Sequence, residues 1–144
     1  MPSGPGCPTV PAHVNWQEAR SVENFKAGCF ALRQGHINAA ASRLYYAIYL
    51  LSWSILESNA VRPSDLQADE KHRWLHGTLA AQSGKVAGYL KFSRQDAEDF
   101  HRAYKALESQ RVQADYGEGG AQRPIVARER DRLEKIVERA FGYR

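Results

Sequence analysis

The chain has 144 residues, 43% of them apolar, and its 20 Lys and Arg residues against 16 Asp and Glu residues give a formal net charge of +4. Two cysteines are too few for a disulfide framework, and no segment reaches the roughly 18 uninterrupted apolar residues of a membrane span. We therefore expect one cytoplasmic domain with no membrane-spanning segment, whose modest positive charge is compatible with phosphate contacts.

The N-terminal stretch contains four prolines and two glycines, and it lacks the positive start and apolar run of a secretory signal. We predict a disordered tail over residues 1–14 and a single helical domain over residues 15–144.

The first helix is predicted to begin at Asn15 or Trp16, where apolar residues start to recur with a mostly helical period, and to stop at Gln34 and Gly35. Cys29 lies among its apolar positions. No flanking charge clearly favours a thiolate, so we interpret Cys29 as a small buried hydrophobic residue rather than a reactive thiol.

The most apolar stretch, NAAASRLYYAIYLLSWSIL from Asn38 to Leu56, belongs to a helix predicted over residues 36–59. Most of its circumference is non-polar, so other helices must cover it on several sides. Arg43 near its start needs an anion, and we expect a buried ion pair with Asp115 or another acidic group. The apolar positions are Leu44, Tyr46, Ala47, Ile48, Leu50, Leu51, Trp53 and Ile55.

A third helix is predicted from near Lys71 to Leu90, weakened locally by three glycines. His72 and His76 within it have the i, i+4 spacing of a two-histidine metal site. The residues between them are an arginine, a tryptophan and a leucine, so we favour a polar helix start packed near the core and expect neither metal nor cofactor.

Ser93 is the predicted N-cap of a fourth helix that runs to Tyr116, and the glycines of GEGG then predict a flexible loop. The last helix, from about Pro124 to Phe141, has one apolar stripe and a mixed-charge face that we expect to be solvated. No stretch alternates in the manner of a strand. The sequence thus predicts an all-α, up-and-down four-helix-type bundle with five helices in total.

Three segments resemble the HEPN domains (higher eukaryotes and prokaryotes nucleotide-binding), especially the small stand-alone prokaryotic members. They are AAASRLYYAIYLLSWSIL in the second helix, KHRWLHG at the start of the third and AYKALESQRVQADYG at the end of the fourth. The resemblance covers roughly residues 18 to 143. It implies a helical bundle, frequently a homodimer, in which many members are metal-independent endoribonucleases.

Those enzymes usually carry an arginine followed a few residues later by a histidine near the end of a core helix. Here the arginine at the family position is Arg111, and no histidine follows it before the C-terminus. Asp115 occupies the place where a proton-transfer group is expected, although an exposed aspartate is ionised at pH 7 and is a poor general acid. A literal Arg-to-His spacing, Arg94 and His101 with six residues between, lies earlier in the same helix.

The resemblance implies catalytic roles for Arg111, Asp115 and Tyr116, and RNA or nucleotide binding by Arg43, Tyr46 and Arg111. Each residue also has a structural interpretation. Arg111 and Asp115 at i, i+4 would form an intrahelical ion pair, and Tyr116 would be a helix-end aromatic packed on the bundle.

Three functions stay open at this point. The first is an RNA- or nucleotide-binding HEPN protein, the ribonuclease toxin of a toxin–antitoxin pair with a minimal nucleotidyltransferase. The second is a non-catalytic dimeric interaction or scaffold bundle that has lost the histidine. The third is a protein whose Tyr116, or another hydroxyl near Arg111, receives a nucleotidyl group from the partner transferase.

Overall fold

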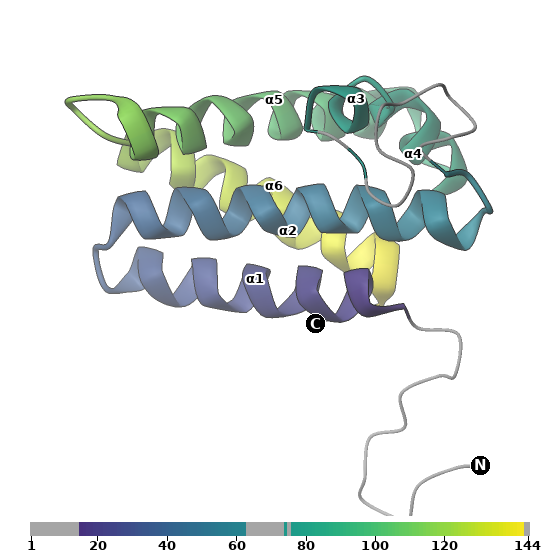
Figure 1. Cartoon of the computed structure of the whole chain (residues 1–144), viewed down its shortest axis with the longest axis horizontal. Coiled ribbons are helices and arrows are strands. Elements are labelled where there is room, and N and C mark those ends of the chain that lie inside the picture. Colours follow the sequence, from purple (N-terminus) through teal and green to yellow (C-terminus); the bar gives the residue numbers. More distant parts are fainter. Residues whose placement is uncertain (1–14, 63–73, 75, 143–144) are drawn as a thin grey trace, which may run out of the picture.

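The computed structural model describes residues 15–62, 74 and 76–142, and within them the chain is all-helical with no strand (Figure 1). The predicted all-α fold class is therefore confirmed. The predicted tail over residues 1–14 and the predicted start of the third helix near Lys71 lie outside the described residues. The helices are α1 (Trp16–Arg33), α2 (Ile37–Ser58), α3 (His76–Ala80), α4 (Ser83–Tyr89), α5 (Arg94–Tyr116) and α6 (Arg123–Phe141).

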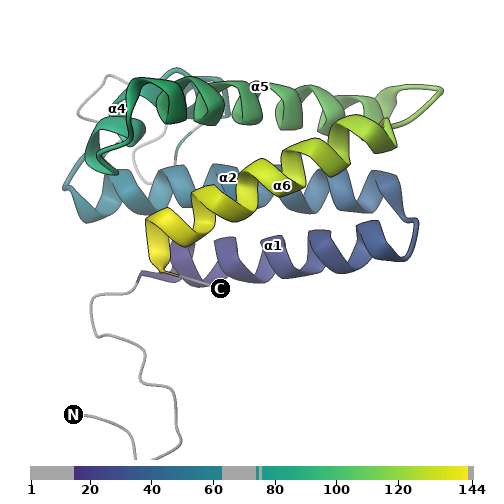
Figure 2. The ribbon, with the colours of Figure 1, turned by 180° about the vertical axis from the view of Figure 1, so that it is seen from behind.

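The four long helices α1, α2, α5 and α6 run in alternating directions along the chain (Figure 1). Seen from behind, α6 crosses obliquely over α2 between α5 and α1, and α4 covers the end of the molecule where α5 begins (Figure 2). Helix α3 packs against α2. Helix α2 contacts every other helix. It is the central helix of an up-and-down bundle, as the apolar pattern predicted.

Capping side chains mark where two of the long helices, α1 and α5, begin. The side chain of Asn15 accepts a hydrogen bond from the backbone N–H of Glu18 at 2.9 Å, and that of Ser93 accepts one from Asp96 N–H at 3.1 Å. Each bond satisfies a donor that has no partner within its helix. At the other end of α1, Gly35 adopts a φ of +79°, which ends the helix at little steric cost.

The core is organised on α2, in which every residue from Leu44 to Leu56 except Tyr46 is buried. Helix α1 approaches it closely at Gly28, where a Cβ atom would lie 2.7 Å from Cγ and Cδ2 of Leu44. The hydroxyl of the buried Ser21 donates to the backbone oxygen of Ala47 at 2.6 Å. Small residues on α1 thus let the two backbones come together.

The prediction of one continuous third helix is wrong in the part that the structure describes. That part forms two short helices, since α3 ends at Ala80 and α4 begins at Ser83. The backbone N–H of Gln82 bonds to the oxygen of Leu79 in the turn between them. Glycines at 77, 84 and 88 weaken helix propensity over this stretch, so the chain turns where tertiary packing requires it. The described part therefore holds six helices rather than the predicted five.

The prediction of a solvated charged face on α6 is wrong at Glu129, whose side chain has no exposed surface. Its carboxylate accepts hydrogen bonds from Arg128 Nε at 2.9 Å and from Arg132 NH1 at 3.2 Å. Glu129 lies on the inward stripe between Val126 and Leu133, so helical spacing places it in the core. The two arginines compensate its charge there.

The loop predicted to be flexible is held by two side chains. Asn38 at the start of α2 accepts a hydrogen bond from the backbone N–H of Ala121 at 2.8 Å, and Gln110 of α5 accepts one from Gln122 N–H at 2.6 Å. Gly120 has a φ of +70° and passes so close to Asn38 that a Cβ atom would lie 2.7 Å from its Oδ1. The loop between α5 and α6 is therefore held to α5 and to the start of α2.

None of the helices in the described ranges combines the length and apolar character needed to cross a membrane.

Replacing Gly28 by Ala is expected to destabilise the bundle by about 1–3 kcal/mol, because the new methyl group meets Leu44 in a closely packed interface. Urea unfolding followed by circular dichroism measures the change. Gly84→Ala is the matched control, since no atom lies within 4 Å of its Cβ position. It should leave stability unchanged or raise it through helix propensity. Equal unfolding midpoints for Gly28→Ala and wild type would contradict the close approach.

Candidate functional site

Arg111 lies in the last third of α5 and points toward α2. Its guanidinium carbon lies 5.1 Å from the centre of the Tyr45 ring, a cation–π contact, and 19% of its side chain is exposed. NH1 donates to Oδ2 of Asp115 at 3.3 Å. The Nε–H is buried and has no hydrogen-bond partner in the described part of the chain. A buried donor without a partner costs free energy. Arg111 is thus held by Tyr45 and Asp115, while one of its donors has no partner in the described residues.

His76, the first residue of α3, contacts the same tyrosine. The Tyr45 hydroxyl and His76 Nδ1 share a short hydrogen bond. The imidazole stacks on the Tyr49 ring, with centroids 4.6 Å apart and planes at 25°, and lies near-parallel to the Tyr45 ring at 5.5 Å. Tyr45 therefore links Arg111 of α5 to His76 of α3. We call Arg111, Tyr45 and His76 the Arg111 site.

Further tyrosines surround this site. Tyr46 meets the His76 ring edge-on at 6.0 Å, and Tyr104 of α5 meets the Tyr45 ring edge-on at the same distance. The Tyr49 hydroxyl donates to the backbone oxygen of Trp74 at 2.5 Å, which fixes the chain just before α3. The i, i+4 spacing of Tyr45 and Tyr49 puts both rings on the face of α2 that receives His76.

Burial raises the pKa of the Tyr45 phenol above its usual value near 10; the Glu108 carboxylate adds to this effect and Arg111 opposes it. Burial is the main cause that raises the pKa of the Tyr104 phenol, and the neighbouring Tyr45 phenol raises it further. Both phenols are therefore neutral at physiological pH. They can take part in hydrogen bonds as donor or acceptor, without adding negative charge beside Arg111.

A neutral phenol can bind each protonation state of the histidine. When Tyr45 donates to Nδ1, the proton of a neutral imidazole is on Nε2; when Nδ1 carries a proton, the phenol oxygen accepts it. His76 can thus gain or lose a proton while its hydrogen bond to Tyr45 persists. That property suits a group that transfers protons close to neutral pH.

The predicted ion pair between Arg43 and Asp115 is wrong. Arg43 is exposed, and its NH1 donates to Asn24 Oδ1 of α1 at 3.3 Å, whereas Asp115 pairs with Arg111. Position 43 faces the α1 side of α2, while Tyr45 faces α3 and α5. The structure does not bring Arg43 to the Arg111 site, although it brings Tyr46 there.

Asp115 contacts the Arg111 site, whereas Tyr116 is exposed to solvent. The interpretation of Arg111 and Asp115 as an intrahelical ion pair is confirmed by the 3.3 Å contact. The interpretation of Tyr116 as an aromatic packed on the bundle is wrong, because the residue is 81% exposed. One turn earlier Val112 is 41% exposed, so the two form an exposed apolar strip beside Arg111.

The other sequence-predicted candidates lie elsewhere. Arg94 is almost fully exposed and pairs with Glu98 at 3.8 Å, while His101 Nδ1 bonds to Ser83 Oγ at 2.7 Å. Cys29 is buried, as predicted, and its sulfur accepts a hydrogen bond from Arg130 Nε at 3.3 Å. His72 lies outside the described residues. Within the described ranges no three His, Cys, Asp or Glu side chains are grouped so as to hold a metal ion.

Sequence reasoning missed His76, Tyr49 and Tyr104 as members of one cluster. A signal for Tyr49 was present, because Tyr45 and Tyr49 share a helical face. His76 was considered only with His72, its neighbour in the sequence. Its contact with Tyr45 depends on how α3 folds back against α2.

Comparison with models of known families, with curated proteins and with solved structures gives no match to this chain.

Replacing Arg43 by Ala is expected to change the free energy of unfolding by less than about 0.5 kcal/mol, because the side chain is exposed and makes one long hydrogen bond. Chemical denaturation of the variant and wild type measures this difference. A loss of several kcal/mol would show that Arg43 is buried after all.

The raised pKa values of Tyr45 and Tyr104 predict a loss of stability at high pH. The folded state retains phenolic protons that the unfolded chain releases near pH 10, so stability is fully present below about pH 10 and falls as pH rises above it. Urea midpoints measured from about pH 8 to about pH 11 follow this loss.

Tyr45→Phe should flatten that pH dependence, while Tyr116→Phe, which changes an exposed phenol, should keep the wild-type slope. The same slope in Tyr45→Phe and wild type would argue against a buried, neutral Tyr45.

Proposed function

We propose that the Arg111 site binds a phosphate group of RNA or of a nucleotide, and that the protein is a metal-independent endoribonuclease of the HEPN type. The observation that supports this proposal is the contact of Tyr45 with both Arg111 and His76. The sequence after Arg111 lacks a histidine, and α3 supplies one from a different part of the chain. The resemblance of the Tyr45 and Arg111 segments to HEPN domains supports it independently.

Arginine suits the first step, which is to hold the scissile phosphate. Its planar guanidinium offers several fixed donors to phosphate oxygens and stays charged at any physiological pH. Arg111 is restrained by the Tyr45 ring and Asp115 but has a donor without a partner in the described residues. A phosphate in this place would meet a preorganised positive charge.

His76 suits the proton transfer. The 2′-hydroxyl oxygen attacks the adjacent phosphorus and gives its proton to the imidazole, while the bond from phosphorus to the 5′-oxygen of the next nucleotide breaks. The departing oxygen takes up a proton from the imidazolium, which leaves a 2′,3′-cyclic phosphate and a free 5′-hydroxyl. Tyr45 orients the imidazole throughout. Asp115 keeps Arg111 in position in this scheme and does not itself transfer the proton.

A second candidate is a non-catalytic interaction bundle, and the exposed strip of Val112 and Tyr116 favours it. An apolar strip beside Arg111 is a suitable contact for a second copy of the chain or for a nucleotidyltransferase partner. The accessible Tyr116 hydroxyl would also be open to nucleotidyl transfer by that partner. An unchanged intact mass after coexpression with the transferase would exclude such a modification.

Purified protein incubated with fluorescently labelled single-stranded RNA is expected to cleave it equally well with and without EDTA. Arg111→Ala and His76→Gln should each lower the cleavage rate by about a hundredfold or more, because one loses the phosphate clamp and the other the proton acceptor. Gel analysis of the products gives the rates and reveals the cyclic phosphate ends.

Arg94→Ala removes an equally basic side chain from the exposed start of α5 and is the matched control, expected to cleave at the wild-type rate. Circular dichroism confirms that each variant is folded. Absence of cleavage by the wild type would contradict the ribonuclease. If the wild type bound RNA without cutting it, and Arg111→Ala lost that binding, the site would be one for binding alone.

A further inference from the structure

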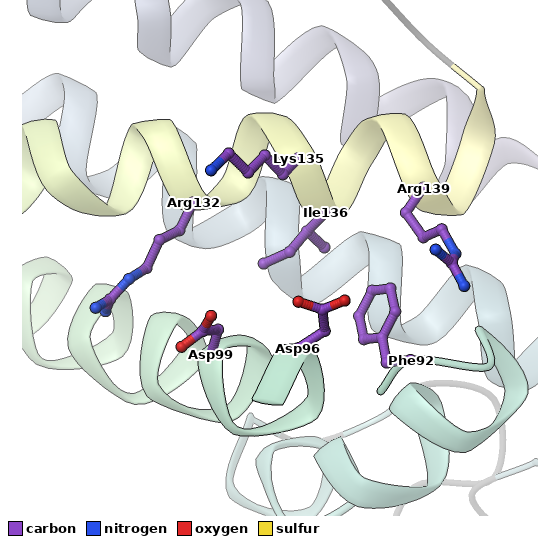
Figure 3. Close-up of a pocket in the computed structure, with 7 residues that line it drawn as sticks. All are labelled: Phe92, Asp96, Asp99, Arg132, Lys135, Ile136 and Arg139. Atoms are coloured by element: carbon purple, nitrogen blue, oxygen red, sulfur yellow. The ribbon is translucent and has the colours of Figure 1, made fainter. Parts of the chain in front are cut away.

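A hollow that is separate from the Arg111 site lies between the first turns of α5 and the second half of α6. Its volume is about 370 Å³, within the size range of small-molecule pockets (Figure 3). One wall is formed by Asp96 and Asp99 of α5. The opposite wall carries three cations of α6, which are Arg132, Lys135 and Arg139.

The two carboxylates face this hollow without a cation of their own. Neither Asp96 nor Asp99 makes an ion pair within the described residues, although Asp99 accepts a hydrogen bond from Gln95 Nε2 at 3.1 Å. They lie one turn apart on α5, so both present oxygen atoms to the same side. Two neighbouring carboxylates repel each other and favour a cation between them.

Two of the opposing cations have partners other than Asp96 and Asp99. Arg132 donates to both carboxylate oxygens of the buried Glu129 at 3.2 Å. Arg139 donates to the backbone oxygen of Lys91 at 3.0 Å and covers the Phe92 ring at 5.7 Å. Lys135 at the rim has no ion pair in the described part of the chain and is exposed.

Apolar side chains lie between the charged walls. Phe92 sits where α4 leads into α5, and its ring meets that of the buried Phe100 edge-on at 6.0 Å. Ile136 projects from α6 between the cations (Figure 3). A ligand that fits this lining needs a positive end, an apolar middle and a negative end.

We propose that this hollow binds a small dipolar molecule that carries a primary ammonium group and a carboxylate joined by an aliphatic chain. The ammonium group lies between Asp96 and Asp99, the aliphatic chain contacts Phe92 and Ile136, and the carboxylate pairs with Lys135. A purely cationic amine would face the cations of α6, and a purely anionic molecule would face the carboxylates of α5. The inference is independent of the ribonuclease proposal, since none of these residues belongs to the Arg111 site.

The probe for this proposal is 6-aminohexanoate, titrated into the full-length ¹⁵N-labelled protein and followed by amide chemical shifts. We expect saturable shifts in residues 92–99 and 132–139 with a dissociation constant on the order of 1 mM, as suits a ligand of this size. Hexylamine and hexanoate each lack one charged end, so their dissociation constants should be higher by about tenfold or more.

The double variant Asp96→Asn with Asp99→Asn should lower the affinity for 6-aminohexanoate by about tenfold or more, and Lys135→Gln should lower it while leaving hexylamine binding unchanged. Asp131→Asn is the matched control, an exposed α6 carboxylate that pairs with Arg130 outside the hollow. It should bind like the wild type.

Three results would overturn the proposal. One is the absence of saturable shifts up to about 50 mM probe, because the expected complex would be nearly saturated there. Another is equal affinity for hexylamine and 6-aminohexanoate, which would remove the role of the carboxylate. The last is an unchanged affinity in the double Asp variant, which would place the ammonium group elsewhere.

Discussion

The burial of α2 is the constraint on which the rest of the structure depends. From Leu44 to Leu56 only Tyr46 keeps partial exposure, so α1, α5, α6 and the α3–α4 pair must each cover one side of it. Buried polar groups need partners within the protein, and the hydroxyls of Tyr45 and Tyr49 bond to His76 and to the backbone oxygen of Trp74. The same burial keeps Tyr45 neutral beside a charged arginine. The core and the candidate site are thus consequences of one packing arrangement.

Much of the fold was accessible from the sequence because it depends on local chemistry. The helix starts at Asn15 and Ser93 follow from capping side chains, and the central place of α2 follows from its apolar circumference. Glu129 was missed although a signal was present, because it lies on the same helical stripe as Val126 and Leu133. Its charge led to the interpretation of a solvated face, whereas in the bundle Arg128 and Arg132 compensate that charge at a covered position.

In the candidate site, too, a contact set by helical spacing was predicted, and contacts set by the packing of helices were not. The pairing of Arg111 with Asp115 depends on helical spacing alone and was predicted. Arg43 was assigned to the wrong face, because an arginine inside an apolar stretch can lie at the one edge of the helix that stays open. His76 bonds to Tyr45 across a sequence separation of 31 residues, and no helical spacing rule relates residues that far apart.

The clasped loop between α5 and α6 bears on where this chain can be cut. Tight surface loops rich in glycine are ordinarily tolerant of proteolytic nicking, inserted segments and circular permutation. Here the amides of Ala121 and Gln122 are bound by Asn38 and Gln110, so a break at that point would release the start of α2 together with the end of α5 and the start of α6. New termini or fused domains belong elsewhere on this scaffold, because this loop joins three helices rather than two.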